Sequence, residues 1–124
     1  MRSRTFILAT GAASGAASVT SGPVFGKLFA IKYMPGTIAT GATFTVTCAH
    51  SDASSKPLLT KANAGTSNAW FYPRDIVNAV ADGAALTGTS GGDREKPIID
   101  GILTVAIATG GNSKAGKAVV YYED

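Results

Sequence analysis

The chain has 124 residues, one cysteine, and 11 basic against 8 acidic side chains, for a formal net charge of +3. This length fits one domain around one hydrophobic core, and the lone Cys48 excludes a disulfide within the chain. The basic residues are spread singly from Arg2 to Lys117, so the sequence lacks the basic stripe that nucleic-acid binding requires. It also lacks a run of about 18 apolar residues, so no membrane-spanning segment is expected.

The N-terminal segment, residues 1–17, superficially resembles a secretory leader, because basic residues precede apolar and then small ones. Its apolar run is short and is broken by Thr10 and Gly11, which favours an ordinary first strand over residues 4–10. We therefore assign residues 1–20 either to an extended N-terminal arm or to an edge strand.

Two strands are expected next in the chain. A short polar strand is predicted over residues 17–21, where a Gly/Ala/Ser loop ends. Residues 27–34 then alternate between apolar and polar side chains, as a half-buried strand does. This alternation predicts that Phe29, Ile31 and Tyr33 share one face.

The middle of the chain begins with a threonine-rich strand over residues 42–49. Its threonines face away from an apolar side that includes Cys48, so we expect a buried structural thiol and a sheet with one wet face. Residues 50–68 are mostly polar, and the pair Leu58-Leu59 leaves room for one further edge strand.

An aromatic cluster over residues 70–74 follows and should close a strand at Pro73, because proline cannot donate to a sheet ladder. The apolar spacing of residues 75–81 predicts a single helical turn. Residues 82–96 contain many glycines and small polar residues and are predicted to form a long loop.

The last segments, residues 102–108 and 117–122, are rich in β-branched and aromatic residues and flank the glycine-rich residues 110–116. This pattern predicts a C-terminal β-hairpin. Both faces of residues 102–108 are largely apolar, so that strand should lie centrally in a sheet. The sequence thus predicts an all-β fold, a single-domain β-sandwich of about seven to eight short strands covering residues 1–124.

Two short motifs resemble the active-site motifs of serine hydrolases. His50 after a strand, together with Ser90 in residues 88–92 (GTSGG), is similar to the signatures of trypsin-like proteases. Only 40 residues separate the two, the chain is too short for two barrels, and Thr89 replaces the usual acidic residue. The same residues 88–92 match the elbow of α/β-hydrolases but lack the strand before and the helix after them. We therefore expect no catalytic residues.

A third motif, residues 111–117, has the spacing of a phosphate-binding loop. Ala118 stands where a magnesium-binding Ser or Thr is required, and a strand is expected to follow instead of a helix. One histidine and one buried cysteine do not form a metal site. No cofactor and no metal are therefore expected.

The densest aromatic cluster supplies the one candidate binding surface. Adjacent aromatic residues at a strand end belong more often to a core than to a ligand site, and they also occur at protein interfaces. The candidate interface consists of Trp70, Phe71, Tyr72 and Arg74.

Several segments together resemble a known group of proteins: residues 21–33 (SGPVFGKLFAIKY), the threonine strand, residues 72–74 (YPR), and residues 100–116 (DGILTVAIATGGNSKAG). They are similar to small β-rich proteins encoded among the virion genes of tailed bacteriophages. The resemblance extends from about residue 18 to residue 122, and each of its motifs is short.

The resemblance implies a non-enzymatic virion structural protein that is assembled in the host cytoplasm. The expected role is capsid decoration, in which the protein acts as a cement and stabilises the head. A head-tail connector, neck or tail protein is the alternative, and a secreted or cell-surface β-sandwich binding module is a further one. The expected partners are the major capsid protein or neck and tail subunits, with the chain forming a symmetric homo-oligomer.

Overall fold

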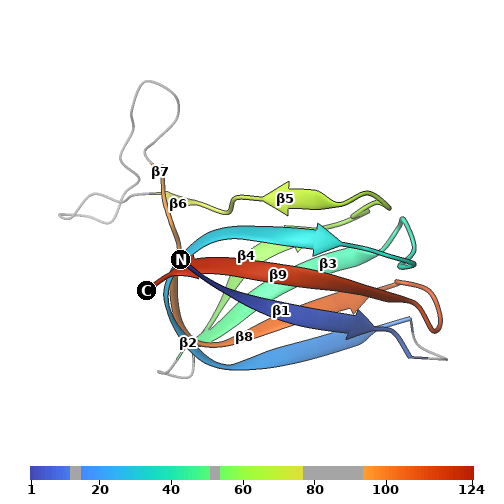
Figure 1. Cartoon of the computed structure of the whole chain (residues 1–124), viewed down its shortest axis with the longest axis horizontal. Helices are drawn as coiled ribbons and strands as arrows, with labels where there is room; N and C mark the ends of the chain where they lie inside the picture. The colour runs from blue at the N-terminus through green and yellow to red at the C-terminus, as the bar shows by residue number, and fades with distance from the viewer. Residues whose placement is uncertain (12–14, 51–53, 77–93) are drawn as a thin grey trace.

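The fold is shown in Figure 1, a computed structural model that describes residues 1–11, 15–50, 54–76 and 94–124. These residues form strands and their connections, and no helix occurs among them. The strands are β1 (Arg2–Ala9), β2 (Ala17–Met34), β3 (Thr43–His50), β4 (Ser55–Lys61), β5 (Ala69–Phe71), β6 (Asp75–Ile76), β7 (Arg94–Glu95), β8 (Ile98–Ala108) and β9 (Ala115–Glu123). The predicted all-β class is confirmed.

Seven of the strands form one antiparallel sheet in the order β1-β9-β2-β8-β3-β4, with β5 added to β2. The short β6 and β7 pair separately. The central position predicted for residues 102–108 is confirmed, because β8 lies between β2 and β3. The N-terminal residues 2–9 form the edge strand β1, one of the two alternatives for this segment.

The sheet folds onto itself because β2 is 18 residues long and changes neighbours along its length. Its first part, to Lys27, pairs with β8, and its second part, from Lys27, pairs with β9 and β5. One half of the sheet therefore contains β1, β9, the end of β2 and β5, and the other contains the start of β2, β8, β3 and β4. Figure 1 shows the curved path of β2 between these halves.

The hydrophobic core lies between the two halves, since every long strand contributes buried side chains to one cluster. Alternation places Phe44, Val46 and Cys48 of β3 in it, and the predicted burial of the thiol is confirmed. Tyr33 is fully buried and stacks on Phe44 with ring centroids 4.5 Å apart. Burial also raises the pKa of the Tyr33 hydroxyl.

Two glycines occupy the corner at which β2 passes from one half-sheet to the other. Gly26 has φ +148° and Gly101, on the neighbouring strand β8, has φ +145°. A Cβ atom on Gly26 would collide with the carbonyl oxygen of Glu123, and one on Gly101 with that of Ala49. The corner therefore needs glycine both for its backbone angles and for the close approach of a third strand.

The predicted C-terminal hairpin is wrong. The two flanks are the strands β8 and β9, but they do not pair with each other, because β2 is inserted between them. Their connection is instead fixed by the N-terminal part of the chain: the Thr10 hydroxyl donates to the carbonyl of Gly111 at 2.6 Å and accepts from the amide of Lys114 at 2.7 Å.

Three local predictions also need correction. The strands expected over residues 17–21 and 27–34 are one continuous strand, β2, with a bulge between Thr20 and Pro23. The start of the predicted helical turn over residues 75–81 is strand β6, and residues 77–81 lie outside the described part. The loop predicted over residues 82–96 contains strand β7 near its end, and residues 82–93 lie outside the described part.

We expect Gly26→Ala to destabilise the protein by about 2 kcal/mol or more, because alanine introduces both backbone strain and a collision with β9. Gly22→Ala is the matched control: it lies in the same strand, has no positive φ, and a Cβ there would meet no atom within 4 Å. Urea unfolding of the two variants compares them directly. Equal stability of both variants would contradict the role assigned to the corner.

Candidate functional site: an aromatic face

The candidate interface lies on the outer face of the half-sheet that contains β5, β2 and β9. Alternation along β5 points Trp70 outward and Phe71 inward, and Tyr72 follows on the outer side. Trp70 is 47% exposed and Tyr72 56% exposed. In the register of the sheet, Trp70 lies opposite Lys32 of β2, which in turn lies opposite Val119 of β9.

The aromatic rings form a connected group across the three strands. Trp70 packs against Tyr121 of β9 with centroids 5.4 Å apart and against Tyr72 with centroids 6.4 Å apart. The Lys32 ammonium lies 5.2 Å from the centre of the Trp70 ring. Ala30, the register partner of Tyr121, is fully buried, as a small residue beneath such rings should be. These mutual contacts hold the exposed rings in fixed positions.

The face continues onto Phe29, which a bulge in β2 turns outward. The register with β9 shifts between Leu28 and Ala30, so Leu28 joins the core while Phe29 stays outside it. The prediction that Phe29 shares a face with Ile31 and Tyr33 is therefore wrong. Phe29 meets Tyr72 edge-on, with centroids 6.2 Å apart and ring planes at 88°.

Two cations surround the Phe29 ring. The Arg74 guanidinium lies 5.9 Å from its centroid and donates through Nη1 to the backbone carbonyls of Phe29 and Pro73, at 3.0 Å and 2.7 Å. The Lys96 ammonium lies 5.3 Å from the same centroid and donates to Oε1 of Glu123 at 2.5 Å. This hydrogen bond, together with the positive charge of Lys96, lowers the pKa of Glu123.

The structure thus brings together three of the four predicted interface residues, Trp70, Tyr72 and Arg74. Phe71 belongs to the other side of β5, where it packs against the core with its ring 6.3 Å from that of Phe44. We name the outward group the aromatic face. Its members are Phe29, Lys32, Trp70, Tyr72, Arg74, Lys96 and Tyr121.

The structure describes the two serine-hydrolase motifs only in part. Ser90 and the rest of residues 88–92 lie outside the described residues, and His50 is the last residue of β3. Strand β9 begins at Ala115, so a strand follows the glycine loop where a phosphate-binding loop needs a helix. In the described ranges no three potential metal-ligating side chains of His, Cys, Asp or Glu gather, and no helix is long and apolar enough to cross a membrane.

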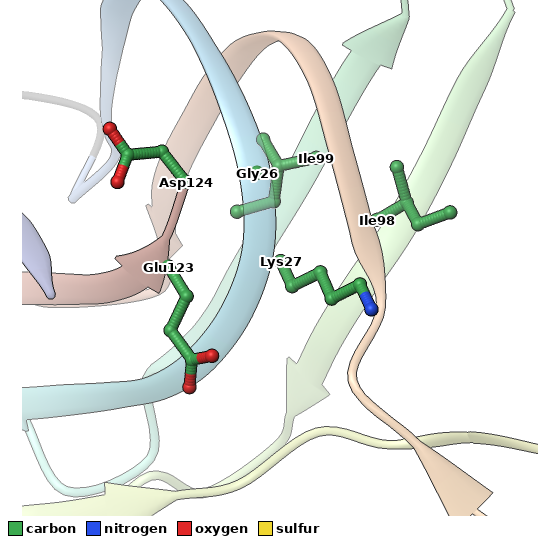
Figure 2. A pocket seen from close by; sticks show the side chains of 6 residues that line it. All are labelled: Gly26, Lys27, Ile98, Ile99, Glu123 and Asp124. Atoms are coloured by element: carbon green, nitrogen blue, oxygen red, sulfur yellow. The ribbon is translucent and has the colours of Figure 1, made fainter.

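A shallow pocket of about 470 Å³ opens beside the corner of β2, lined by Gly26, Lys27, Ile98, Ile99, Glu123 and Asp124. Figure 2 shows the two acidic side chains on one side of it and Ile98 on the other. Both acids are already engaged, Glu123 with Lys96 and Asp124 with Arg2. The pocket therefore presents no free carboxylate pair for acid–base chemistry.

Comparison with known proteins finds no matching family model, no matching curated protein and no matching solved structure. The resemblance to phage virion proteins therefore stays a prediction.

We expect Lys96→Met to raise the pKa of Glu123 toward the ordinary glutamate range, because Lys96 supplies the main interaction that lowers it. A lowered folded-state pKa stabilises the fold above the unfolded-state pKa, and this contribution disappears as the pH falls through the folded-state value. The variant should therefore lose less stability on acidification. Carboxyl NMR titration measures the pKa itself.

Lys27→Met is the control for this titration, since Lys27 acts on Glu123 only through a weaker electrostatic interaction. If both variants moved the Glu123 pKa equally, the hydrogen bond from Lys96 would not be its main cause.

Proposed function

We propose that the protein is a non-enzymatic structural component of a tailed-phage particle, a capsid decoration protein that cements the shell by docking on neighbouring subunits through the aromatic face. The observation that carries the proposal is the pair of exposed rings of Trp70 and Tyr72, which pack on each other and, through Trp70, on the half-buried Tyr121 of the sheet. The sequence resemblance supplies the virion context.

The composition of the aromatic face favours a protein partner. Trp, Tyr and Arg are the residue types that contribute most to the energy of protein interfaces when a partner covers them. Trp70 and Tyr72 retain about half of their exposure, so a partner still has apolar area to bury. Because neighbouring rings already restrict their rotamers, binding costs little further side-chain entropy.

The cations of the face are arranged unfavourably for nucleic acid. Arg74 donates to two backbone carbonyls, Lys96 donates to Glu123, and Lys32 lies over the Trp70 ring. A single-strand binding surface needs cations that follow a phosphate backbone beside its stacking rings. Here the cations hold the rings and the strand β2 in place, which supports a protein partner.

A cement protein must occupy many equivalent positions on the shell. Quantitative mass spectrometry of washed particles should therefore find the chain at a copy number comparable to that of the major capsid protein. About a dozen copies would indicate a neck ring instead. Absence of the chain from washed particles would overturn the virion proposal.

Trp70→Ala should reduce attachment to particles by at least tenfold, while the loss of its two ring contacts costs about 2 kcal/mol of stability. Trp70→Phe should retain most of the attachment. Ile102→Ala is the control, because Ile102 is 40% exposed on strand β8 in the other half-sheet. Pelleting of particles with added protein measures attachment, and calorimetry measures stability. Undiminished attachment of Trp70→Ala would exclude the aromatic face as the docking surface.

A further inference from the structure

The outer edge of strand β1 presents unused backbone hydrogen-bonding groups. β1 ends the sheet order and pairs with β9 alone in the described part of the chain. The amide of Thr10, the next residue after β1, donates to the carbonyl of Lys114 at 2.8 Å and continues the register with β9. Because an antiparallel ladder alternates, the amides and carbonyls of Ser3, Thr5 and Ile7 point away from β9. An added strand would bond to these groups.

The side chains of β1 divide between two faces that offer different contacts. Phe6 points into the core, whereas Ile7 is 63% exposed on the outer face. Alternation puts Arg4 on the same side as Phe6, but nearer the start of the strand, where it is exposed. There Arg4 lines a hollow of about 310 Å³ together with Phe25 and Tyr122. A strand beside β1 would therefore place one side chain against Ile7 and another at the hollow.

Arg4 determines which charge the added strand needs. Its guanidinium has no ion pair or hydrogen bond among the described residues. The acidic residues at the end of β9 are not available to it, because Glu123 pairs with Lys96 and Asp124 pairs with Arg2. A strand that covers this edge takes water away from Arg4, and an acidic side chain directly opposite gives the guanidinium a partner in exchange.

The edge strands of a second copy of this chain do not supply that acid. Residues 1–11, which contain β1, include two arginines and no acidic residue. A pairing of β1 with β1 therefore leaves Arg4 opposite a neutral or a like-charged side chain. The other edge strands of the sheet, β4 and β5, contain no acidic residue either. The strand that Arg4 requires is therefore assigned to a different protein.

We propose that the outer edge of β1 docks an extended segment of another protein, which adds to the sheet as an antiparallel strand with an acidic residue opposite Arg4 and an apolar residue opposite Ile7. Backbone hydrogen bonds along the edge supply the affinity, and these two side-chain contacts supply the selectivity. Antiparallel pairing continues the pattern of the whole sheet. The inference goes beyond the proposed docking role of the aromatic face and does not rest on it.

A capped peptide of sequence VIVTEST tests the proposal, because antiparallel pairing with residues 2–8 puts its glutamate opposite Arg4 and its isoleucine opposite Ile7. Fluorescence anisotropy of the labelled peptide with the full chain should give a Kd of about 100 µM or tighter. The peptide VIVTKST, with lysine in place of glutamate, should bind at least tenfold more weakly. Absence of binding to VIVTEST at about 1 mM chain, or equal binding of the two peptides, would overturn the proposal.

Backbone methylation separates strand addition from simple attraction between charges. In the proposed register the first threonine of VIVTEST, opposite Thr5, directs its amide toward β1, whereas the glutamate after it directs its amide away. N-methylation of that threonine should abolish binding, and N-methylation of the glutamate should have little effect. Equal effects of the two methylations would contradict pairing with β1.

A charge swap keeps the result independent of folding defects. Arg4→Glu should reverse the preference and bind VIVTKST at least tenfold more tightly than VIVTEST, a gain that an unfolded variant would not show. Lys61→Glu is the matched control, because it makes the same change of net charge on β4 in the other half-sheet, and it should keep the preference of the wild type. Loss of the preference in Lys61→Glu as well would assign the effect to net charge and overturn the site. Trp70→Ala should bind both peptides as the wild type does, so failure of the aromatic face and failure of the β1 edge are distinguishable.

Discussion

The corner of strand β2 is the constraint on which the arrangement of the whole molecule depends. One strand of 18 residues pairs with β8 before the corner and with β9 and β5 after it. Gly26 and Gly101 make this possible, because the backbone there takes positive φ and a third strand comes too close for a Cβ atom. The two half-sheets, the core between them and the separate outer faces all follow from this turn of the chain.

Alternation of apolar and polar residues predicted most strands and the buried thiol of Cys48, because the period of two reflects which side of a strand meets the core. Alternation could not predict which strands pair with one another. The glycine-rich loop at residues 110–116 has the composition of a hairpin turn, yet long-range pairing inserts β2 between its flanks. The separation predicted between the strands over residues 17–21 and 27–34 is likewise wrong, since Pro23 and Gly26 lie at a bulge and at the corner of one continuous strand.

The aromatic face could be predicted only in part, because some of its members come together only through the pairing of distant strands. Local alternation suffices to separate Trp70 and Tyr72 from Phe71 along the chain. Tyr121 joins them because β9 pairs with β2 in one register, and Phe29 joins because a bulge shifts that register by one residue. Neither the strand order nor the bulge leaves a local signal, so the four members of the face that lie outside residues 70–74 were beyond prediction from one sequence.

The edge strands β4 and β5 resist the addition of further strands, whereas the edge strand β1 does not. Strand β4 carries Pro57 between two lysines, and β5 is three residues long and is soon followed by Pro73. Short strands, lysines and prolines at an edge oppose the addition of further strands. The edge strand β1 is eight residues long and contains no proline or lysine, so its outer backbone stays open to a further strand.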